Sequence, residues 1–514
     1  MRCLKHLVLT LSVTFGALAF AGPSFAAGDP AFYFRWKSAL PQLSETVDPA
    51  DPAETGEDDG EQEGPEVELA LSGGTLPTAV TGEAWDFDFS SLLTAVGVDK
   101  GDVSFSIVPL PGEEFPGWMS MGGGGSAVGY PDRTGSYGFE VVASYGDVES
   151  RLSYAVVISG KALDARRITA GQDHTCAIVG EGKVMCWGYD SYGQIGDGKS
   201  RLGGLDPTEV DGVLFPSMVS AGGDFTCTLM LDSTVVCWGR SNRGQMGRGT
   251  LASGPHLPQS IPGLAGVTMI ATGQQHACVV VYGGSVMCWG LNDKGQAGND
   301  SLANQSTPFL VPGVSGATSV AAGASHSCAL LNDGSVKCWG VNSSGQLGDG
   351  SNTNSAVPVQ VYGLSGAVAI GSRGQHTCAV ISDGSLRCWG KNDSGQLGNR
   401  TLTDSNVPVV VPGLGGVMEV STGLFSTCTI DFANRAKCWG SGVSGALGQG
   451  RFEGSLEPVE PLGLEGLTGI VSGNRHACAI VPGDVLKCWG DNNYHQLGDG
   501  SGVAKNAPQA VVVN

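Results

Sequence analysis

Cysteine is the residue type with the clearest chemical pattern in this chain of 514 residues, which contains 15 cysteines. Fourteen of them follow the spacing Cys-x9-Cys-Trp-Gly, repeated seven times with a period of 50 or 51 residues. Structural zinc sites need two ligands two to four residues apart, so this spacing does not fit zinc, whereas an oxidising compartment keeps such pairs closed as disulfides. The predicted pairs are Cys176–Cys186, Cys227–Cys237, Cys278–Cys288, Cys328–Cys338, Cys378–Cys388, Cys428–Cys438 and Cys478–Cys488.

Histidine stands two residues before the first cysteine in five of the repeats. These residues are His174, His276, His326, His376 and His476, with Phe225 and Ser426 at the equivalent positions of the other two repeats. A ring of histidines suggests metal binding, but equivalent positions of neighbouring sheets lie about 10 Å apart, too far to share an ion. We therefore predict hydrogen-bonded structural histidines and no metal site.

Two strings resemble nucleotide-binding motifs. The segment from Gly193 to Ser200 fits the phosphate-loop pattern, and the segment from Gly440 to Gly445 fits G-x-G-x-x-G. Phosphate binding needs a strand before such a loop and a helix after it, but both strings lie in a repeated turn. The chain also lacks G-x-S-x-G and H-E-x-x-H. We predict no cofactor and no catalytic residue. Asn-x-Ser sites such as Asn342 and Asn392 matter only where the host glycosylates them.

Short strands must position these residues, since no helical periodicity is found in the repeats. In a typical repeat, two apolar strands flank Asp333-Gly334, a dipeptide that favours a hairpin. The two cysteines are symmetric about this turn, so they can oppose each other on adjacent strands. Each tryptophan follows its cysteine, points to the opposite side of the strand and is predicted to pack between units. Seven units of this length predict an all-β, seven-bladed β-propeller over 165–514.

The repeated residues resemble a known family. Gly323, His326 and Cys328, followed by Trp339-Gly340 and the turn 345–350, are similar to the regulator of chromosome condensation repeat. The resemblance implies a propeller. Intracellular members do not generally carry paired cysteines, which suggests an exported branch. The guanine-nucleotide exchange known for intracellular members is not expected after export.

The ends of the repeat region suggest how its ring closes. The first unit starts at Arg167-Ile168 and lacks the Pro-x-x-Val strand that precedes the other six, while Pro508 to Val513 supply such a strand after the last unit. We therefore predict that the C-terminal strand completes the first blade, which removes an exposed sheet edge.

The N-terminal part predicts export. Residues 1–26 form a signal peptide, with Arg2 and Lys5 before an apolar stretch and Ser24-Phe25-Ala26 at the cleavage site. This stretch is short for a membrane span of about 20 residues, although an uncleaved anchor is the alternative. Residues 27–66 form an acidic disordered linker with an aromatic segment, 31–36, of open role. The alternative interpretation of the acidic run is a segment that binds calcium or a basic partner.

Residues 67–160 show strand-like alternation. Trp85, Phe87 and Phe89 alternate with acids, and turns rich in Gly and Pro separate the strands. This pattern predicts a β-sandwich, and the segment from Gly135 to Phe139 resembles bacterial immunoglobulin-like, cadherin-like modules. The resemblance implies a spacer.

The net charge of −21 excludes a nucleic-acid binder, because affinity there comes from Lys and Arg on phosphates. We predict a secreted or periplasmic, cell-surface monomer without a membrane span after cleavage. Its function is non-enzymatic binding of a protein or cell-surface glycan through a propeller face, with variable loops at 198–207, 249–258 and 451–458. The alternatives are a protein inhibitor, resembling exported propellers that inhibit β-lactamases, and an extracellular hydrolase or lyase acting at the channel mouth.

Overall fold

The computed structural model describes residues 67–513, except 74–75, 81–83, 111–118, 130–134, 160, 164, 181 and 252–256. The predicted signal peptide, the aromatic segment 31–36 and nearly all of the acidic run lie outside the described residues. Among the described residues, no helix is both long enough and apolar enough to cross a membrane.

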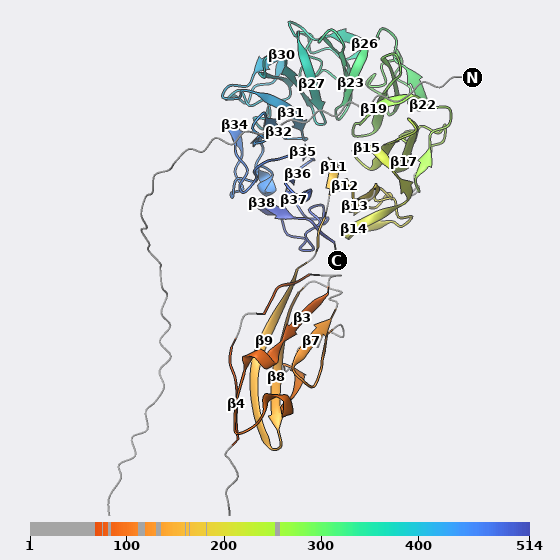
Figure 1. The fold of residues 1–514 in the computed structure, drawn as a ribbon. Helices are drawn as coiled ribbons and strands as arrows, with labels where there is room; N and C mark the ends of the chain where they lie inside the picture. The colour runs from red at the N-terminus through yellow and green to blue at the C-terminus, as the bar shows by residue number, and fades with distance from the viewer. Residues whose placement is uncertain are drawn as a thin grey trace, which may run out of the picture. The chain divides into compact units, whose positions relative to one another are not determined.

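Seven consecutive four-stranded antiparallel sheets build the repeat region, 165–513, and they are arranged around a common centre (Figure 1). We call them repeat sheets 1 to 7. Sheets 1 to 3 consist of β11 (Ala165–Ala170), β12 (His174–Val179), β13 (Lys183–Asp190) and β14 (Arg201–Leu214); β15 (Pro216–Ala221), β16 (Phe225–Met230), β17 (Val235–Gly239) and β18 (Gln259–Ser260); and β19 (Val267–Thr272), β20 (His276–Val281), β21 (Ser285–Gly290) and β22 (Gln305–Leu310).

Sheets 4 to 7 repeat the same order. They consist of β23 (Ala317–Ala322), β24 (His326–Leu331), β25 (Val336–Gly340) and β26 (Ser355–Gln360); β27 (Ala367–Ser372), β28 (His376–Ile381), β29 (Leu386–Gly390) and β30 (Ser405–Val410); β31 (Val417–Thr422), β32 (Ser426–Asp431), β33 (Ala436–Gly440) and β34 (Ser455–Val459), with the 3-10 turn η3 (Val443–Gly445); and β35 (Gly469–Ser472), β36 (His476–Val481), β37 (Val485–Gly490) and β38 (Lys505–Ala510).

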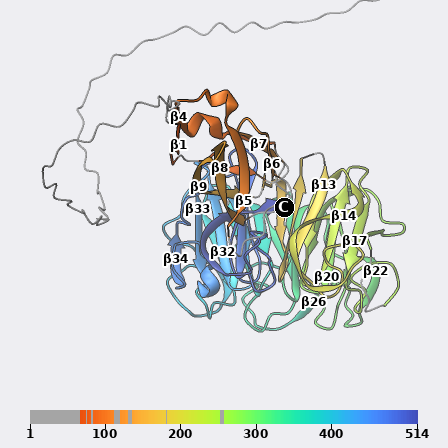
Figure 2. The same cartoon turned by 90° about the horizontal axis from the view of Figure 1, so that it is seen from below.

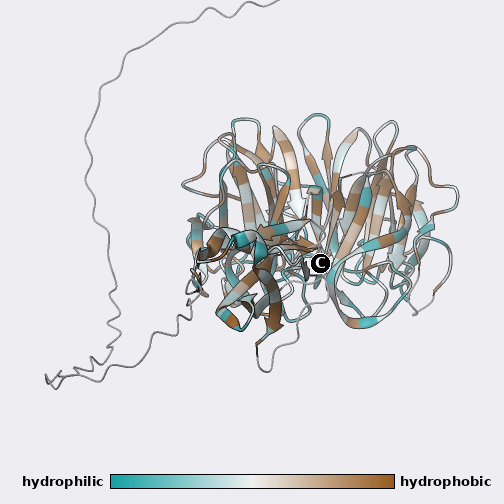
Figure 3. Cartoon of the chain, turned by 60° about the horizontal axis from the view of Figure 1, so that its bottom comes forward, coloured by the Kyte–Doolittle hydropathy of each residue, from teal (hydrophilic) through white to brown (hydrophobic). Residues whose placement is uncertain are grey.

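Neighbouring strands of each sheet run in opposite directions, so the turns that join them lie on two opposite faces of the repeat region (Figure 2). The first strand of each sheet lines a central channel. We call the face reached at the end of these strands, around residues 171–173 and their equivalents, the mouth face. The opposite face carries the turns between second and third strands, and we call it the hairpin face. Apolar residues follow the strands (Figure 3) and fill the spaces between neighbouring sheets.

Each predicted cysteine pair is a disulfide in the structure. Cys176 opposes Cys186 in the register of β12 and β13, and the Cα atoms of each of the seven pairs lie 4.1 Å apart. All fourteen cysteines are fully buried. The hairpin symmetry seen in the sequence therefore corresponds to the strand register.

The tryptophans pack between sheets, as predicted, and also join them by hydrogen bonds. Trp238 Nε1 donates to the carbonyl of Gln194 in the preceding sheet at 2.8 Å, and Trp339 Nε1 donates to that of Gln296 at 2.9 Å. The same bond joins the two ends of the ring, from Trp187 Nε1 to the carbonyl of Gln496 at 2.9 Å.

The prediction that the C-terminal strand completes the first sheet is wrong. The fourth strand of sheet 1 is its own β14, while β38 pairs with β37 in sheet 7. The Pro-x-x-Val strand therefore follows its own unit, because an antiparallel partner is most simply reached through a short connection. The last residues, β39 (Val512–Val513), instead pair with β10 (Lys161–Ala162), which precedes sheet 1.

Residues 68–159 form three smaller sheets around one core. The strands are β2 (Ala79–Val80), β9 (Val148–Ser159), β8 (Gly135–Tyr145) and β5 (Ser104–Pro109) in one sheet; β3 (Trp85–Asp88), β7 (Ser126–Gly129) and β6 (Met119–Met121) in another; and β1 (Glu68–Leu71) with β4 (Leu93–Val96), accompanied by the 3-10 turns η1 (Phe89–Leu92) and η2 (Lys100–Asp102). Phe89 begins a 3-10 turn, so it does not continue the alternation of the strand before it. Its ring lies 5.0 Å from that of Tyr154 in the core.

Candidate functional site

The five histidines are structural and connect neighbouring sheets. The Nε2 atom of each histidine lies 2.8 to 2.9 Å from a hydroxyl oxygen of the next sheet. The pairs are His174–Thr226, His276–Ser327, His326–Thr377, His376–Thr427 and His476–Thr175. In several sheets the hydroxyl donates to the same Gln carbonyl that accepts from the tryptophan, as Ser327 does to Gln296. The hydroxyl is then an acceptor for the histidine, which assigns the proton to Nε2.

Burial lowers the pKa of each histidine, to about 3 for His174, His326, His376 and His476 and to about 4 for His276. These imidazoles are therefore neutral at physiological pH. Within the described residues, no group of three or more His, Cys, Asp or Glu side chains is placed to hold a metal ion.

The two repeats without histidine also lack its partner. Phe225 is in sheet 2, and the next sheet has Ala277 at the position of the hydroxyl residue. Ser426 is in sheet 6, and the next sheet has Ala477 at that position. A histidine and the hydroxyl of the next repeat are thus replaced together, since a hydrogen bond needs both groups. Comparing each repeat with the next one along the chain could have revealed this pairing from the sequence.

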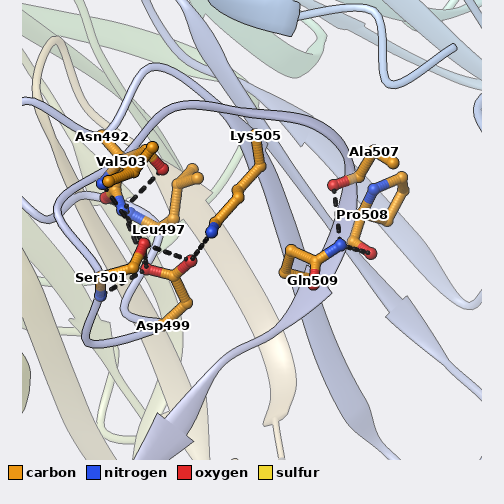
Figure 4. Close-up of polar contacts among 9 residues, drawn as sticks. All are labelled: Asn492, Leu497, Asp499, Ser501, Val503, Lys505, Ala507, Pro508 and Gln509. Atoms are coloured by element: carbon orange, nitrogen blue, oxygen red, sulfur yellow. Dashed lines mark hydrogen bonds and ion pairs between the residues drawn. The ribbon is translucent and has the colours of Figure 1, made fainter. Parts of the chain in front are cut away.

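A buried asparagine after the Trp-Gly pair organises the turns of the mouth face. Figure 4 shows it in sheet 7, where Asn492 Oδ1 accepts from the Leu497 amide at 3.0 Å and Nδ2 donates to Asp499 at 2.8 Å. Asn342 and Asn392, which begin Asn-x-Ser sequences, occupy the same position, are fully buried and make the same bonds. The turn network thus uses both asparagine side chains, which are not available on the surface.

Sheet 1 departs from this pattern, because Asp190 stands where the asparagine is found in sheets 3, 4, 5 and 7. Burial raises the pKa of Asp190 to about 6 and the neighbouring Asp197 raises it further, against the opposing effects of the Ile195 amide and of Arg201. Asp190 Oδ2 accepts no hydrogen bond and lies 3.8 Å from Arg201 Nε. The pKa of Asp190 in the folded state lies above the unfolded value near 3.9. The stability that the protonated carboxyl contributes is therefore present below pH 4 and is lost as pH rises to 6.

We expect Asp190→Asn to stabilise the protein at pH 7. The new amide can donate to Asp197, as Asn342 donates to Asp349. The burial cost of the carboxylate and its repulsion from Asp197 are removed, and these outweigh the lost attraction to Arg201 because the pKa of Asp190 is raised overall. The expected gain is about 1–2 kcal/mol after allowing for solvent screening, and it should vanish below pH 4. Urea unfolding at both pH values measures it. The reciprocal Asn342→Asp change is the control and should destabilise at pH 7; a neutral Asp190→Asn would contradict this account.

The mouth face carries one aromatic cluster that spans the junction of the last and first sheets. The rings of Tyr189 and Tyr494 lie 4.8 Å apart between centroids, and Tyr192 lies 6.4 Å from Tyr189. Arg240 of sheet 2 places its Cζ 4.3 Å from the centre of the Tyr192 ring. We call these four residues the tyrosine patch. Tyr494 is 37% exposed and the other three are partly exposed.

Acidic residues adjoin the patch. Arg240 Nη1 lies 2.9 Å from Asp224 Oδ2, which fixes the guanidinium over Tyr192. Burial raises the pKa of Asp173, which lies one position from the channel-lining Gln172. The positions equivalent to Tyr189 in sheets 3 to 6 are Leu291, Val341, Lys391 and Ser441, so only this side of the ring combines tyrosine with arginine.

Exposed apolar residues also surround the outer rim of the mouth face. They precede or begin the fourth strands and are 56–79% exposed: Leu202, Leu251, Leu302, Leu402, Phe452 and Val503. Of the predicted variable loops, the segment 198–207 is largely strand, because β14 begins at Arg201. The segment 451–458 enters β34 at Ser455, and 252–256 lies outside the described residues.

The channel contains two small cavities at the mouth-face end. A narrow one of about 30 Å³ is lined by Gln172, Gln274 and Asn474, and a larger one of about 190 Å³ is lined by the first strands of all seven sheets. Arg373 lines both cavities and donates from Nη2 to the carbonyl of Ala221 at 2.6 Å, across the channel.

At the hairpin-face end the channel widens into a cavity of about 490 Å³, where Arg167 and Glu419 are among the lining residues. Burial raises the pKa of Glu419 to about 7, against the opposing effects of the Ile470 amide and of Arg167. The two nucleotide-like strings lie in mouth-face turns. Residues 193–200 follow β13, and residues 440–445 run from the last residue of β33 to the end of the three-residue η3.

Comparisons with known proteins agree with this architecture. Two models described as the regulator of chromosome condensation (RCC1) repeat match the chain, one at 165–194, 267–296, 317–346, 367–396 and 468–496, the other at 232–280, 283–330, 333–380 and 383–430. Among curated proteins, the mitochondrial RCC1 domain-containing protein RUG3 of Arabidopsis thaliana is 35% identical over 27% of this chain and 34% of its own length. The ultraviolet-B receptor UVR8 of the same plant is 30% identical over 32% of this chain and 38% of its own length. The chain thus spans little more than a third of either relative.

Solved structures show the same fold at low identity. Human WBSCR16 gives a TM-score of 0.58 at 23% identity, covering 64% of this chain and 95% of that one. Yeast RCC1 (Prp20), crystallised bound to Kap60, gives 0.56 at 19% identity, covering 69% and 85%. The chain therefore carries regulator of chromosome condensation repeats, and its repeat region is an all-β propeller of that type.

Proposed function

We propose that this protein is an exported or cell-surface, non-enzymatic scaffold that binds a partner protein through the mouth face. The seven repeat sheets are then the blades of a closed seven-bladed propeller over 165–514. Residues 67–160 are an immunoglobulin-like spacer, 27–66 an acidic linker and 1–26 a signal peptide. A cell-surface glycan is the other partner class that exposed tyrosines can contact.

The tyrosine patch carries this proposal. Tyrosine and arginine are enriched among the residues that dominate binding energy at protein interfaces, above all where partly buried rings can be desolvated. The patch offers three such rings and a guanidinium held by Asp224, so little ordering cost remains on binding. The apolar rim enlarges the same face.

The relatives and the disulfides support the proposal. One title describes yeast RCC1 bound to Kap60, and another reports binding of Prp20p to Gsp1p and histones. Both titles describe a protein of this fold that binds other proteins. Seven buried disulfides suit an oxidising compartment, so a partner outside the cytosol is expected here.

The test replaces the patch in the full-length mature chain. We expect Tyr189→Ala with Tyr494→Ala to weaken capture of the partner from the cell-surface fraction at least tenfold, measured by quantitative mass spectrometry. Stability should change little, since exposed side chains usually contribute under about 0.5 kcal/mol.

Two matched controls locate the interface. Lys391→Ala changes the position equivalent to Tyr189 in sheet 5, and Phe432→Ala removes a 70% exposed ring from the hairpin face. Both should retain the partner. Loss of binding in Phe432→Ala alone would place the interface on the hairpin face and would contradict the assignment to the tyrosine patch.

A further inference from the structure

Arg373 occupies a position that the repeat reserves for glycine. The equivalent residues in the six other sheets are Gly171, Gly222, Gly273, Gly323, Gly423 and Gly473. A Cβ atom at Gly171 would lie 2.3 Å from the His174 ring, and one at Gly273 would lie 2.4 Å from the Gly323 carbonyl. Packing of the ring therefore demands glycine at these six positions, and the arginine is an exception that needs its own reason.

The backbone of sheet 5 is rearranged to carry this side chain. In the other six sheets the glycine N–H donates to the carbonyl three residues on, as Gly323 does to His326 at 2.8 Å. Among the described backbone hydrogen bonds, Arg373 makes none of this kind. Ser372 Oγ donates to the His376 carbonyl instead, at 3.2 Å. A residue that departs from the glycine of the other repeats and loses a backbone hydrogen bond is typical of a functional position.

The guanidinium is buried in the channel without a carboxylate. Within the described residues, its hydrogen bonds go from Nη2 to the backbone carbonyls of Ala221, at 2.6 Å, and Gly222, at 3.5 Å, and it has no ion pair. Its Nε and Nη1 atoms are not fully enclosed, and Arg373 lines both cavities at this end of the channel. Burial lowers the pKa of Arg373 to about 10, so the group remains cationic at neutral pH.

An enclosed guanidinium normally has an anion beside it, because a buried charge is costly unless it is paired. Thr422 Oγ1 and Ser472 Oγ also lack a hydrogen-bond partner, but both oxygens are themselves enclosed and do not reach the cavity. A small anion in the cavity would therefore pair with the guanidinium.

We propose that the channel binds one small free oxyanion, of the phosphate or carboxylate class, through the guanidinium of Arg373. A planar guanidinium presents parallel N–H groups that match either class. The cavity of about 190 Å³ restricts the ligand to a few heavy atoms. Of the surrounding carboxylates, Asp224 is paired with Arg240 outside the channel.

The experiment is titration of the full-length mature protein with inorganic phosphate and with acetate, in low-chloride buffer, followed by calorimetry and thermal unfolding. We expect saturable binding of at least one of the two anions and a rise in melting temperature. Arg373→Gln keeps donors but removes the charge, and should bind at least tenfold more weakly. Arg373→Gly restores the residue of the six other sheets, so it should fold and should not bind. The general stabilisation that phosphate gives to many proteins would appear equally in both variants.

The control is Arg475→Gln, which removes an exposed arginine at the mouth face and should leave affinity unchanged. Binding of acetate alone or phosphate alone assigns the ligand class. The proposal is overturned if neither anion binds saturably to the wild type, or if Arg373→Gln binds as tightly as the wild type.

Discussion

Acidification from pH 7 to pH 5 is expected to destabilise the repeat region by about 2 kcal/mol for each of the five buried histidines, of order 10 kcal/mol in all. Their pKa values in the folded state are about 3 to 4, below the unfolded value near 6.5. Folding therefore favours the neutral ring. The stability that this gives is fully present above pH 6.5 and is lost as pH falls from 6.5 towards 3.

The structural reason is that a second proton has no acceptor. Nε2–H of His174, His276, His376 and His476 already donates to the hydroxyl of the next sheet, and Nδ1 of the same four residues is buried without a partner. A Cβ atom at Gly273 would lie only 2.7 Å from Nδ1 of His276, so the backbone packs closely against this nitrogen. Protonation there places an unpaired charge in the wall between sheets, which costs several kcal/mol unless the sheets separate.

Urea unfolding between pH 5 and pH 7 measures the effect. The matched variant is His276→Phe with Ser327→Ala, which copies the Phe225–Ala277 pair present elsewhere in the ring. It should fold and should lose about one fifth of the pH dependence. An unchanged pH dependence in this variant would show that other groups cause the acid sensitivity.

Loss of the disulfides is the second large effect that we expect. Each bridge closes a hairpin of 11 residues, which stabilises by roughly 3 kcal/mol in the chain-entropy model. Removal of one pair, Cys328→Ala with Cys338→Ala, should cost about 2–4 kcal/mol. Removal of all seven should exceed the 5–15 kcal/mol of an ordinary domain, so the fully reduced chain should not refold.

Mass spectrometry of a non-reduced digest, cut between repeats, should show only links within repeats. Because every cysteine is fully buried, dithiothreitol should reduce the native protein only as fast as it opens, and urea should accelerate the reaction. Several free thiols, or mainly links between repeats, would contradict the pairing.

The sequence by itself determined the architecture of the repeats. A period of 50 or 51 residues with Asp-Gly turns predicts the all-β repeated sheets, and the symmetry of Cys328 and Cys338 about such a turn predicts their opposition across β24 and β25. Both inferences succeed because they concern neighbours along the chain, where the local geometry of a hairpin leaves few alternatives.

Contacts between sheets were decided only by the tertiary structure. The partner of each histidine lies in the next repeat or, for His476 and Thr175, 301 residues away. The C-terminal strand was assigned to the wrong sheet for the same reason, because a repeated pattern fits several neighbours equally well.

The candidate sites depend on this closure as well. Tyr494 lies against Tyr189 only because Trp187 and Gln496, 309 residues apart, are joined where the ring closes. The sequence does show Arg373 at a glycine position, but the Ala221 carbonyl that it reaches is 152 residues away. Closing the chain into a ring brings its distant repeats to one channel and one face. Those contacts cannot be predicted from the spacing of residues within one repeat.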